Sequence, residues 1–228
     1  MQKGITLVEL MISMAIATIL ILATYSMHSM AESVYRSTRE DWGCMQSLRT
    51  ALLQLDQDLL QCAYLMPQDL KIVSKQGELF IGGLPVTTQH TGLRLKGSDP
   101  PPYFSVVTAR EASGLRLDTV DIDQDAVPDF WADLGIITDN GAYVISHAYA
   151  RGNAFLPLKT RPFAAIGDRV IPAIHYDIRD YGLYRNGQLL AEGIDVFHAS
   201  VEGVTLTVYL RVTSHGTTRE IHYAYPIG

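Results

Sequence analysis

Proline is absent from the first 66 residues of this 228-residue chain, and cysteine occurs only twice in all of it. Two cysteines, Cys44 and Cys62, allow at most one intrachain disulfide, so the chain is not a small disulfide-stapled scaffold. Proline interrupts helices by removing a backbone donor, and its absence before Pro67 permits a long helix. Gly43 is the one glycine between Gly4 and that proline, so no cluster of helix-breaking residues divides the region.

Charge is missing from residues 10–31, which contain no Lys, Arg, Asp or Glu. At ~1.5 Å per residue, a helix of this stretch is roughly 33 Å long, about the hydrocarbon thickness of a bilayer. Glu9 directly precedes it, and a charged side chain near a membrane interior costs ~2.5–3.5 kcal/mol and usually marks function. A secretory signal peptide is cleaved after its apolar run, whereas Lys3-Gly4 lies before this one, so cleavage there leaves the helix on the mature protein.

Positive charge is also in deficit, since 18 Lys and Arg stand against 24 Asp and Glu, for a formal net charge of −6. An acidic surface repels phosphates, so we expect no direct contact with nucleic acid. The sequence also lacks the motifs of zinc peptidases, redox dithiols, P-loop nucleotide binders and serine hydrolases. We therefore expect no enzymatic activity.

A helical repeat of apolar residues precedes Pro67, in steps of four, three, four and four: Leu48, Leu52, Leu55, Leu59 and Ala63. We predict one helix from about Ile5 to about Tyr64, with its first half in a membrane or filament core. The polar residues between these positions are expected to face solvent: Arg49, Gln54, Asp56, Gln57, Asp58 and Gln61. In such a helix Cys44 and Cys62 lie ~27 Å apart. That separation is too large for a disulfide and predicts two free, mostly buried thiols.

After Pro67 apolar and polar residues alternate over short segments, which is typical of antiparallel strands. Gln76-Gly77 and Asn186-Gly187 mark the turns of two hairpins, and Asn-Gly is the stronger turn signal. The C-terminal part predicts further strands over residues 173–179, 194–200, 204–213 and 218–225. We therefore predict an α+β protein in which a long N-terminal helix, half of it transmembrane, packs on an antiparallel β-sheet.

The extreme N-terminus carries a specific signal, in which Lys3 and Gly4 are followed by Ile-Thr-Leu-Val-Glu. This run closely resembles the class III prepilin leader of type IV pilins and pseudopilins. The resemblance implies that a prepilin peptidase cleaves between Gly4 and Ile5 and methylates the new N-terminus of Ile5, a position where Phe is commoner. It also implies that Glu9 acts in assembly by neutralising the new α-amine of a neighbouring subunit. The alternative is that Glu9 pairs with the amine of its own chain.

The C-terminal part resembles, more loosely, PilW-type minor pilins and their type II secretion counterpart, GspJ. The similarity lies in residues 174–179, 182–185 and 190–194. It implies the pilin fold and a place in the tip or initiation complex of a type IV pilus. The implied partners are other minor pilins or pseudopilins, the major pilin, the prepilin peptidase and the inner-membrane assembly platform. The implied location is the bacterial inner membrane, with the C-terminal domain outside the cytoplasm, and then the pilus or pseudopilus.

These patterns predict four parts: a leader, 1–4; a transmembrane or filament-core helix, 5–31; its amphipathic continuation, 32–66; and a β-rich globular domain, 67–228. Two other functions fit the same features. One is a J-type pseudopilin of a type II secretion system. The other is a membrane-anchored, calcium-dependent adhesin module.

An acidic run in the β-rich part is a candidate calcium site, with side-chain or backbone oxygens from Asp121, Asp123, Asp125, Val127 and Asp129. Alternate carboxylates in a tight loop converge on one cation, and hard oxygen ligands in this number suit Ca²⁺. The run resembles the calcium loops of thrombospondin type 3 repeats. It departs from them at Ala126, where the sharp turn usually takes glycine. The alternative is a solvated acidic turn, and no other cofactor is expected.

Overall fold

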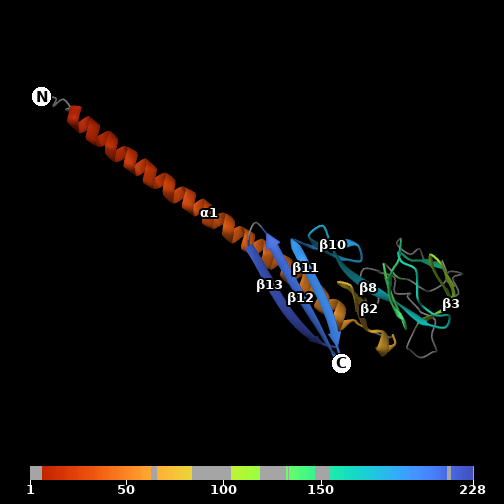
Figure 1. The fold of residues 1–228 in the computed structure, drawn as a ribbon. Coiled ribbons are helices and arrows are strands. Elements are labelled where there is room, and N and C mark those ends of the chain that lie inside the picture. The colour runs from red at the N-terminus through yellow and green to blue at the C-terminus, as the bar shows by residue number, and fades with distance from the viewer. Residues whose placement is uncertain are drawn as a thin grey trace, which may run out of the picture. The chain divides into compact units, whose positions relative to one another are not determined.

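The computed structural model describes residues 7–62, 66–83, 104–118, 132, 134–146, 155–214 and 217–227 (Figure 1). These residues form a long helix, α1, a short 3-10 helix, η1, and strands β1 to β13. Their bounds are α1 Leu7–Leu60, η1 Gln68–Leu70, β1 Ile72–Lys75, β2 Glu78–Gly82, β3 Ser105–Glu111, β4 Gly114–Asp118, β5 Gly135–Thr138, β6 Gly141–Val144, β7 Phe155–Pro157, β8 Arg169–Arg179, β9 Gly182–Arg185, β10 Gln188–Glu192, β11 Ile194–Glu202, β12 Thr205–Ser214 and β13 Thr217–Pro226. The predicted α+β class, one long apolar helix followed by antiparallel sheets, is confirmed.

Helix α1 ends at Leu60, slightly before the predicted end near Tyr64. The amide of Cys62 donates a hydrogen bond to the carbonyl oxygen of Leu59 at 3.1 Å, so a tight turn follows the last helical residue. By their contacts, residues 1–43 and 44–228 form two compact units. The second unit contains the C-terminal part of α1 and all the strands.

The strands form two antiparallel sheets. In the larger one, β8 is the central strand and pairs with β2, β3, β5 and β9. The smaller sheet has the order β11-β12-β13. Both predicted hairpin turns are present, and Gln76-Gly77 and Asn186-Gly187 have the positive φ angles that such two-residue turns require. A third tight turn, between β8 and β9, places Asp180 and Tyr181 at positive φ without a glycine.

The core of the second unit consists of two clusters separated by β2 and β8. Leu79 and Ile81 point to the cluster that includes α1 and the β11-β12-β13 sheet, whereas Phe80 points to the other cluster. This follows from the two-residue period of a strand. On α1 the fully buried apolar residues are Cys44, Leu48, Ala51 and Leu55, so the predicted packing of Leu48 and Leu55 is confirmed.

Asp58 of α1 is buried, with 1% of its surface exposed, and the expectation that it faces solvent is wrong. Its carboxylate accepts two hydrogen bonds from Arg185 of β9, at 2.6 and 2.8 Å, and one from the hydroxyl of Tyr176 of β8. Burial and the Asp58 charge raise the pKa of Tyr176, which keeps the hydroxyl protonated as a donor. Asp58 lies three residues after Leu55 and seven after Ala51, on the buried face of the helix. The cluster therefore fixes the rotation of α1 on the sheet.

Replacing Asp58 by Ala is expected to lower the free energy of unfolding by about 3–5 kcal/mol, because it leaves the Arg185 guanidinium buried without its counterion. Tyr176→Phe removes one hydrogen bond and should cost about 1 kcal/mol. Denaturant unfolding of the full chain in detergent, followed by tryptophan fluorescence, measures both changes. The matched control is Asp56→Ala, since Asp56 is exposed on the same helix. Equal losses from Asp56→Ala and Asp58→Ala would contradict the assigned role.

Candidate assembly site

The N-terminal part of α1 is apolar on all sides, and every described side chain from Leu7 to Arg39 is exposed. A helix of a water-soluble protein buries one apolar stripe, whereas a helix with apolar residues all round requires hydrocarbon or other helices around it. By length and composition, α1 is the one helix among the described residues that could cross a membrane. This surface is therefore the first candidate interaction site.

Three hydroxyl groups within this apolar stretch are satisfied by the helix itself. Ser13, Thr18 and Thr24 each donate a hydrogen bond of 2.8 Å to the carbonyl oxygen four residues earlier. Such internal bonding makes hydroxyls compatible with a helix in an apolar environment. Glu9 is the one acidic residue among residues 7–31 and lies in the first described turn of α1, where the helix dipole favours negative charge.

Several predicted site residues lie outside the described part of the chain. Gly4 and Ile5 precede it, so their geometry relative to Glu9 is not described. The five calcium-site residues also lie outside it. Among the residues that are described, no group of three or more His, Cys, Asp or Glu could hold a metal ion. Calcium binding by the acidic run therefore stays a prediction.

The two cysteines are free, as predicted. Cys44 is buried in the core, and Cys62 is half-buried after the end of α1. The Cys62 thiol donates a hydrogen bond of 3.2 Å to the carbonyl oxygen of Lys71. Burial raises the pKa of Cys62 to about 11, although the nearby Lys71 ammonium lowers it. The thiol is therefore protonated at neutral pH and is a poor nucleophile.

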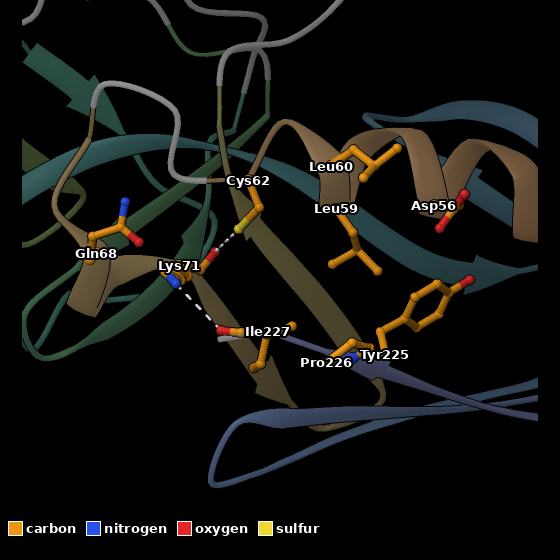
Figure 2. A pocket seen from close by; sticks show the side chains of 9 residues that line it. All are labelled: Asp56, Leu59, Leu60, Cys62, Gln68, Lys71, Tyr225, Pro226 and Ile227. Carbon is orange, nitrogen blue, oxygen red and sulfur yellow. Dashed lines mark hydrogen bonds between the residues drawn. The ribbon is translucent and has the colours of Figure 1, made fainter.

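A cavity of about 400 Å³ adjoins Cys62, between the end of α1, η1 and the end of β13 (Figure 2). Its lining residues are Asp56, Leu59, Leu60, Cys62, Gln68, Lys71, Tyr225, Pro226 and Ile227. The Lys71 ammonium donates a hydrogen bond of 3.3 Å to the carbonyl oxygen of Ile227, which ties β13 to the segment before β1 (Figure 2). Because the Cys62 thiol is protonated, these lining residues provide no activated nucleophile.

Sequence reasoning missed a cross-link formed by Arg169 at the start of β8. Its guanidinium pairs with Asp69 of η1 and with Asp139 in the turn between β5 and β6. Asp139 also accepts a hydrogen bond of 2.6 Å from the backbone amide of Arg169. One side chain thus holds three segments together at the end of the unit where β8 begins.

His175 of β8 is a second buried polar group, with 2% of its surface exposed. Its ring packs 4.7 Å from that of Phe80, and its nitrogens lie 3.5 Å from a Glu78 oxygen and 3.8 Å from an Asp177 oxygen. Neither nitrogen makes a hydrogen bond to a described residue. Burial lowers the pKa of His175, while Asp177 and Glu78 raise it and Lys159 lowers it further. The net effect is downward, so the ring is neutral at pH 7.

Comparison with protein families gave one match, to the family described as "Prokaryotic N-terminal methylation motif", over residues 1–25. No curated protein and no solved structure matched the chain. The matched motif is the signal of type IV pilins and pseudopilins, and it indicates a protein of that kind. Together with the apolar helix, it is consistent with a membrane-anchored pilin that assembles with other pilins after processing by a prepilin peptidase.

The folded protein is expected to lose stability as the pH falls through the ordinary histidine pKa of about 6.5. Because burial lowers the pKa of His175 in the folded state, the unfolded chain binds the proton more readily. The contribution of neutral His175 to the free energy of unfolding is fully present above pH 6.5. It declines as the pH falls from there toward the lower pKa of His175 in the folded state. His175→Phe should flatten this part of the profile of unfolding free energy against pH. Asp177→Asn removes a charge that raises the pKa of His175, so it should steepen the profile; parallel profiles for all three proteins would contradict the assignment.

Proposed function

We propose that this protein is a minor pilin that is cleaved after Gly4, methylated at Ile5 and incorporated through α1 into the tip or initiation complex of a type IV pilus. Before assembly it resides in the bacterial inner membrane, with residues 44–228 on the extracytoplasmic side. Its partners are other minor pilins, the major pilin, the prepilin peptidase and the inner-membrane assembly platform. The proposed role is structural and does not depend on calcium.

The observation that carries the proposal is the all-round apolar surface of α1, which overlaps the methylation motif of residues 1–25. The same helix continues from Leu7 to Leu60, so its apolar part and the part that packs on the sheets are one continuous element. Lipid covers such a surface before assembly, and the helices of neighbouring subunits cover it afterwards. The two environments are similarly apolar, so transfer between them does not require the helix to unfold.

Glu9 supplies specificity to this transfer. Cleavage after Gly4 creates a positive α-amine on Ile5, and both that charge and the Glu9 carboxylate are costly in an apolar environment. Two opposite charges 4 Å apart attract by about 4 kcal/mol at an effective dielectric constant of 20. When Glu9 pairs with the Ile5 amine of a neighbouring subunit, this attraction sets the position of one helix along the axis of the next.

The size of the globular unit favours a minor subunit over a major one, since residues 44–228 form a bulky head for dense packing in a fibre. The resemblance of residues 174–179, 182–185 and 190–194 to PilW-type proteins favours a pilus. A J-type pseudopilin of a type II secretion system is the second candidate, because the same resemblance includes GspJ. Co-purification after crosslinking in membranes separates them: secretion-system subunits as the only partners would overturn the pilus assignment.

Cleavage is tested by mass spectrometry of the protein isolated from membranes. The mature chain is expected to begin at Ile5 and to carry one extra methyl group on its terminal nitrogen. Gly4→Val should retain Met1, because a bulky side chain then precedes the scissile bond. A wild-type chain that begins at Met1, or beyond residue 31, would contradict the proposal.

Glu9→Ala is expected to reduce incorporation into filaments about tenfold or more while membrane levels stay constant, because the incoming amine has no carboxylate to pair with. The measurement is the ratio of the protein in sheared filaments to that in membranes. Glu32→Ala is the matched control, since Glu32 lies on the same helix, is exposed and pairs with Arg36 at 2.6 Å. Normal incorporation of Glu9→Ala would remove the proposed role of Glu9.

A further inference from the structure

We propose that the groove between the end of α1 and strand β13 binds an extended segment of a different polypeptide. The segment pairs with the outer edge of β13 as a fourth strand of the smaller sheet, and it places a large apolar side chain in the cavity beside Cys62. The inference goes beyond the proposed function, because it concerns residues 44–228 alone and holds for a pilin and a pseudopilin alike.

Strand β13 has one edge with which no described strand pairs. It is the outer strand of the β11-β12-β13 sheet, where all ten of its residues pair with β12 (Figure 1). An edge strand presents a row of backbone amides and carbonyl oxygens to which a further strand can bond. An extended polypeptide offers the matching row, whereas a lipid chain does not. The edge therefore favours a peptide as the occupant.

The part of β13 next to the cavity lacks the protection that is common on edge strands. Natural edges are guarded by charged side chains or proline, which discourage pairing with another chain. Residues 221–225 contain no Lys, Arg, Asp, Glu or Pro, and Pro226 is the last residue of the strand. The charged residues of β13, Arg219 and Glu220, come before this stretch. Residues 221–225 are therefore chemically suited to strand addition.

The cavity adjoins this stretch and supplies the second half of the site. Its volume is about 400 Å³, and Leu59 of α1 and Tyr225 of β13 lie on either side of it (Figure 2). Tyr225 belongs to the core cluster that contains α1, and Ile221 packs against that cluster, so alternate residues of β13 face the helix. In an added strand, the residues that pair with these positions point their side chains toward α1 as well. The one near the end of β13 enters the cavity.

The lining of the groove selects an apolar side chain. The Tyr223 ring lies 4.3 Å from that of Tyr225, between centroids, and 46% of Tyr223 is exposed. Leu60 of α1 also lines the cavity and is 82% exposed. The charged lining residues, Asp56 and Lys71, have opposite signs, so together they do not select a charged side chain. A large apolar residue of the bound segment covers these exposed surfaces best.

A second copy of this chain fits the cavity less well than a different polypeptide does. In an antiparallel twofold dimer, β13 pairs with the β13 of the second copy. The C-terminal end of one strand then lies opposite the N-terminal end of the other, which brings Thr218 and Arg219 of the copy toward the cavity. A short hydroxyl and a guanidinium do not provide a large apolar side chain. The occupant is therefore assigned to a different polypeptide.

The first test is photo-crosslinking in cells that express the full chain, with p-benzoylphenylalanine in place of Tyr223 or, as a second attachment position, Leu60. The control position is Tyr181, which is 77% exposed but lies in the turn between β8 and β9. We expect adducts to a different polypeptide, about tenfold more abundant than from the control position. The crosslinked segment should contain a large apolar residue within a few positions of the attachment site. Adducts to phospholipid or to a second copy, equal yields from all positions, or no adduct would overturn the proposal.

Strand addition is then measured on the full chain in detergent, with a synthetic peptide of the crosslinked segment as the probe. Hydrogen exchange of the amides in residues 221–225 should slow about tenfold when the peptide binds, and exchange in β4 should not change. Alkylation of Cys62 should slow as well, because the inserted side chain covers a residue that lines the cavity. Unchanged exchange in β13 would show that the peptide does not add as a strand.

Substitutions on α1 test the cavity itself. Leu60→Ser should weaken binding of the same peptide about tenfold, because it removes apolar area from the lining. Leu53→Ser is the matched control and should not weaken it, since Leu53 is 59% exposed on the same helix but does not line the cavity. Both side chains are exposed, so thermal unfolding should be unchanged. Equal peptide affinities of the two variants would refute the role of the cavity, whereas a wild-type chain that is not cleaved at Gly4 would refute only the proposed function.

Discussion

An apolar surface that the chain itself leaves uncovered is the constraint on which the N-terminal unit depends. Side chains from Leu7 to Ala31 point outward on all sides of α1, and all of them are exposed. Water cannot be their final environment, because the cost of hydrating so much apolar area grows with that area. The methylation motif indicates how this helix is processed. Glu9 is the single acidic residue among residues 7–31.

The buried cluster of Asp58, Arg185 and Tyr176 has a different role. A buried ion pair stabilises a fold little more than well-packed apolar residues would. It does specify geometry, because the carboxylate satisfies both donors only at one rotation of α1 relative to β8 and β9.

Strands β2 and β8 organise the rest of the globular unit, since alternate residues of each contribute to different core clusters. His175 lies at this boundary, with a ring that is buried beside Phe80 and left without hydrogen bonds to described residues. Arg169 begins the same strand and pairs with Asp69 and Asp139, so its side chain joins three segments. Both core clusters and this cross-link therefore depend on one strand.

Local chemistry by itself determines much of this protein. The leader, the uncharged stretch of residues 10–31 and the Asn186-Gly187 turn are each recognised within a few consecutive residues, because their physics is local. The same holds for the free thiols, since almost all of the chain between Cys44 and Cys62 is helical and keeps them apart. The helix stripe was predicted only in part. Leu48 and Leu55 belong both to the predicted repeat and to the observed buried face, which continues through Ala51 to Asp58.

Only the tertiary structure decided what lies opposite each residue. From the sequence pattern, Asp58 was predicted to face solvent. It is buried because it pairs with Arg185, which lies 127 positions away in the chain. The burial of His175 and the exposure of Phe163 could not be predicted either. The alternation and the hydrophobicity of a segment do not specify which other segments cover it. Burial and pairing arise from contacts between distant segments, so a pattern of neighbouring residues does not contain them, whereas helices, turns and processing motifs depend on residues that are already adjacent.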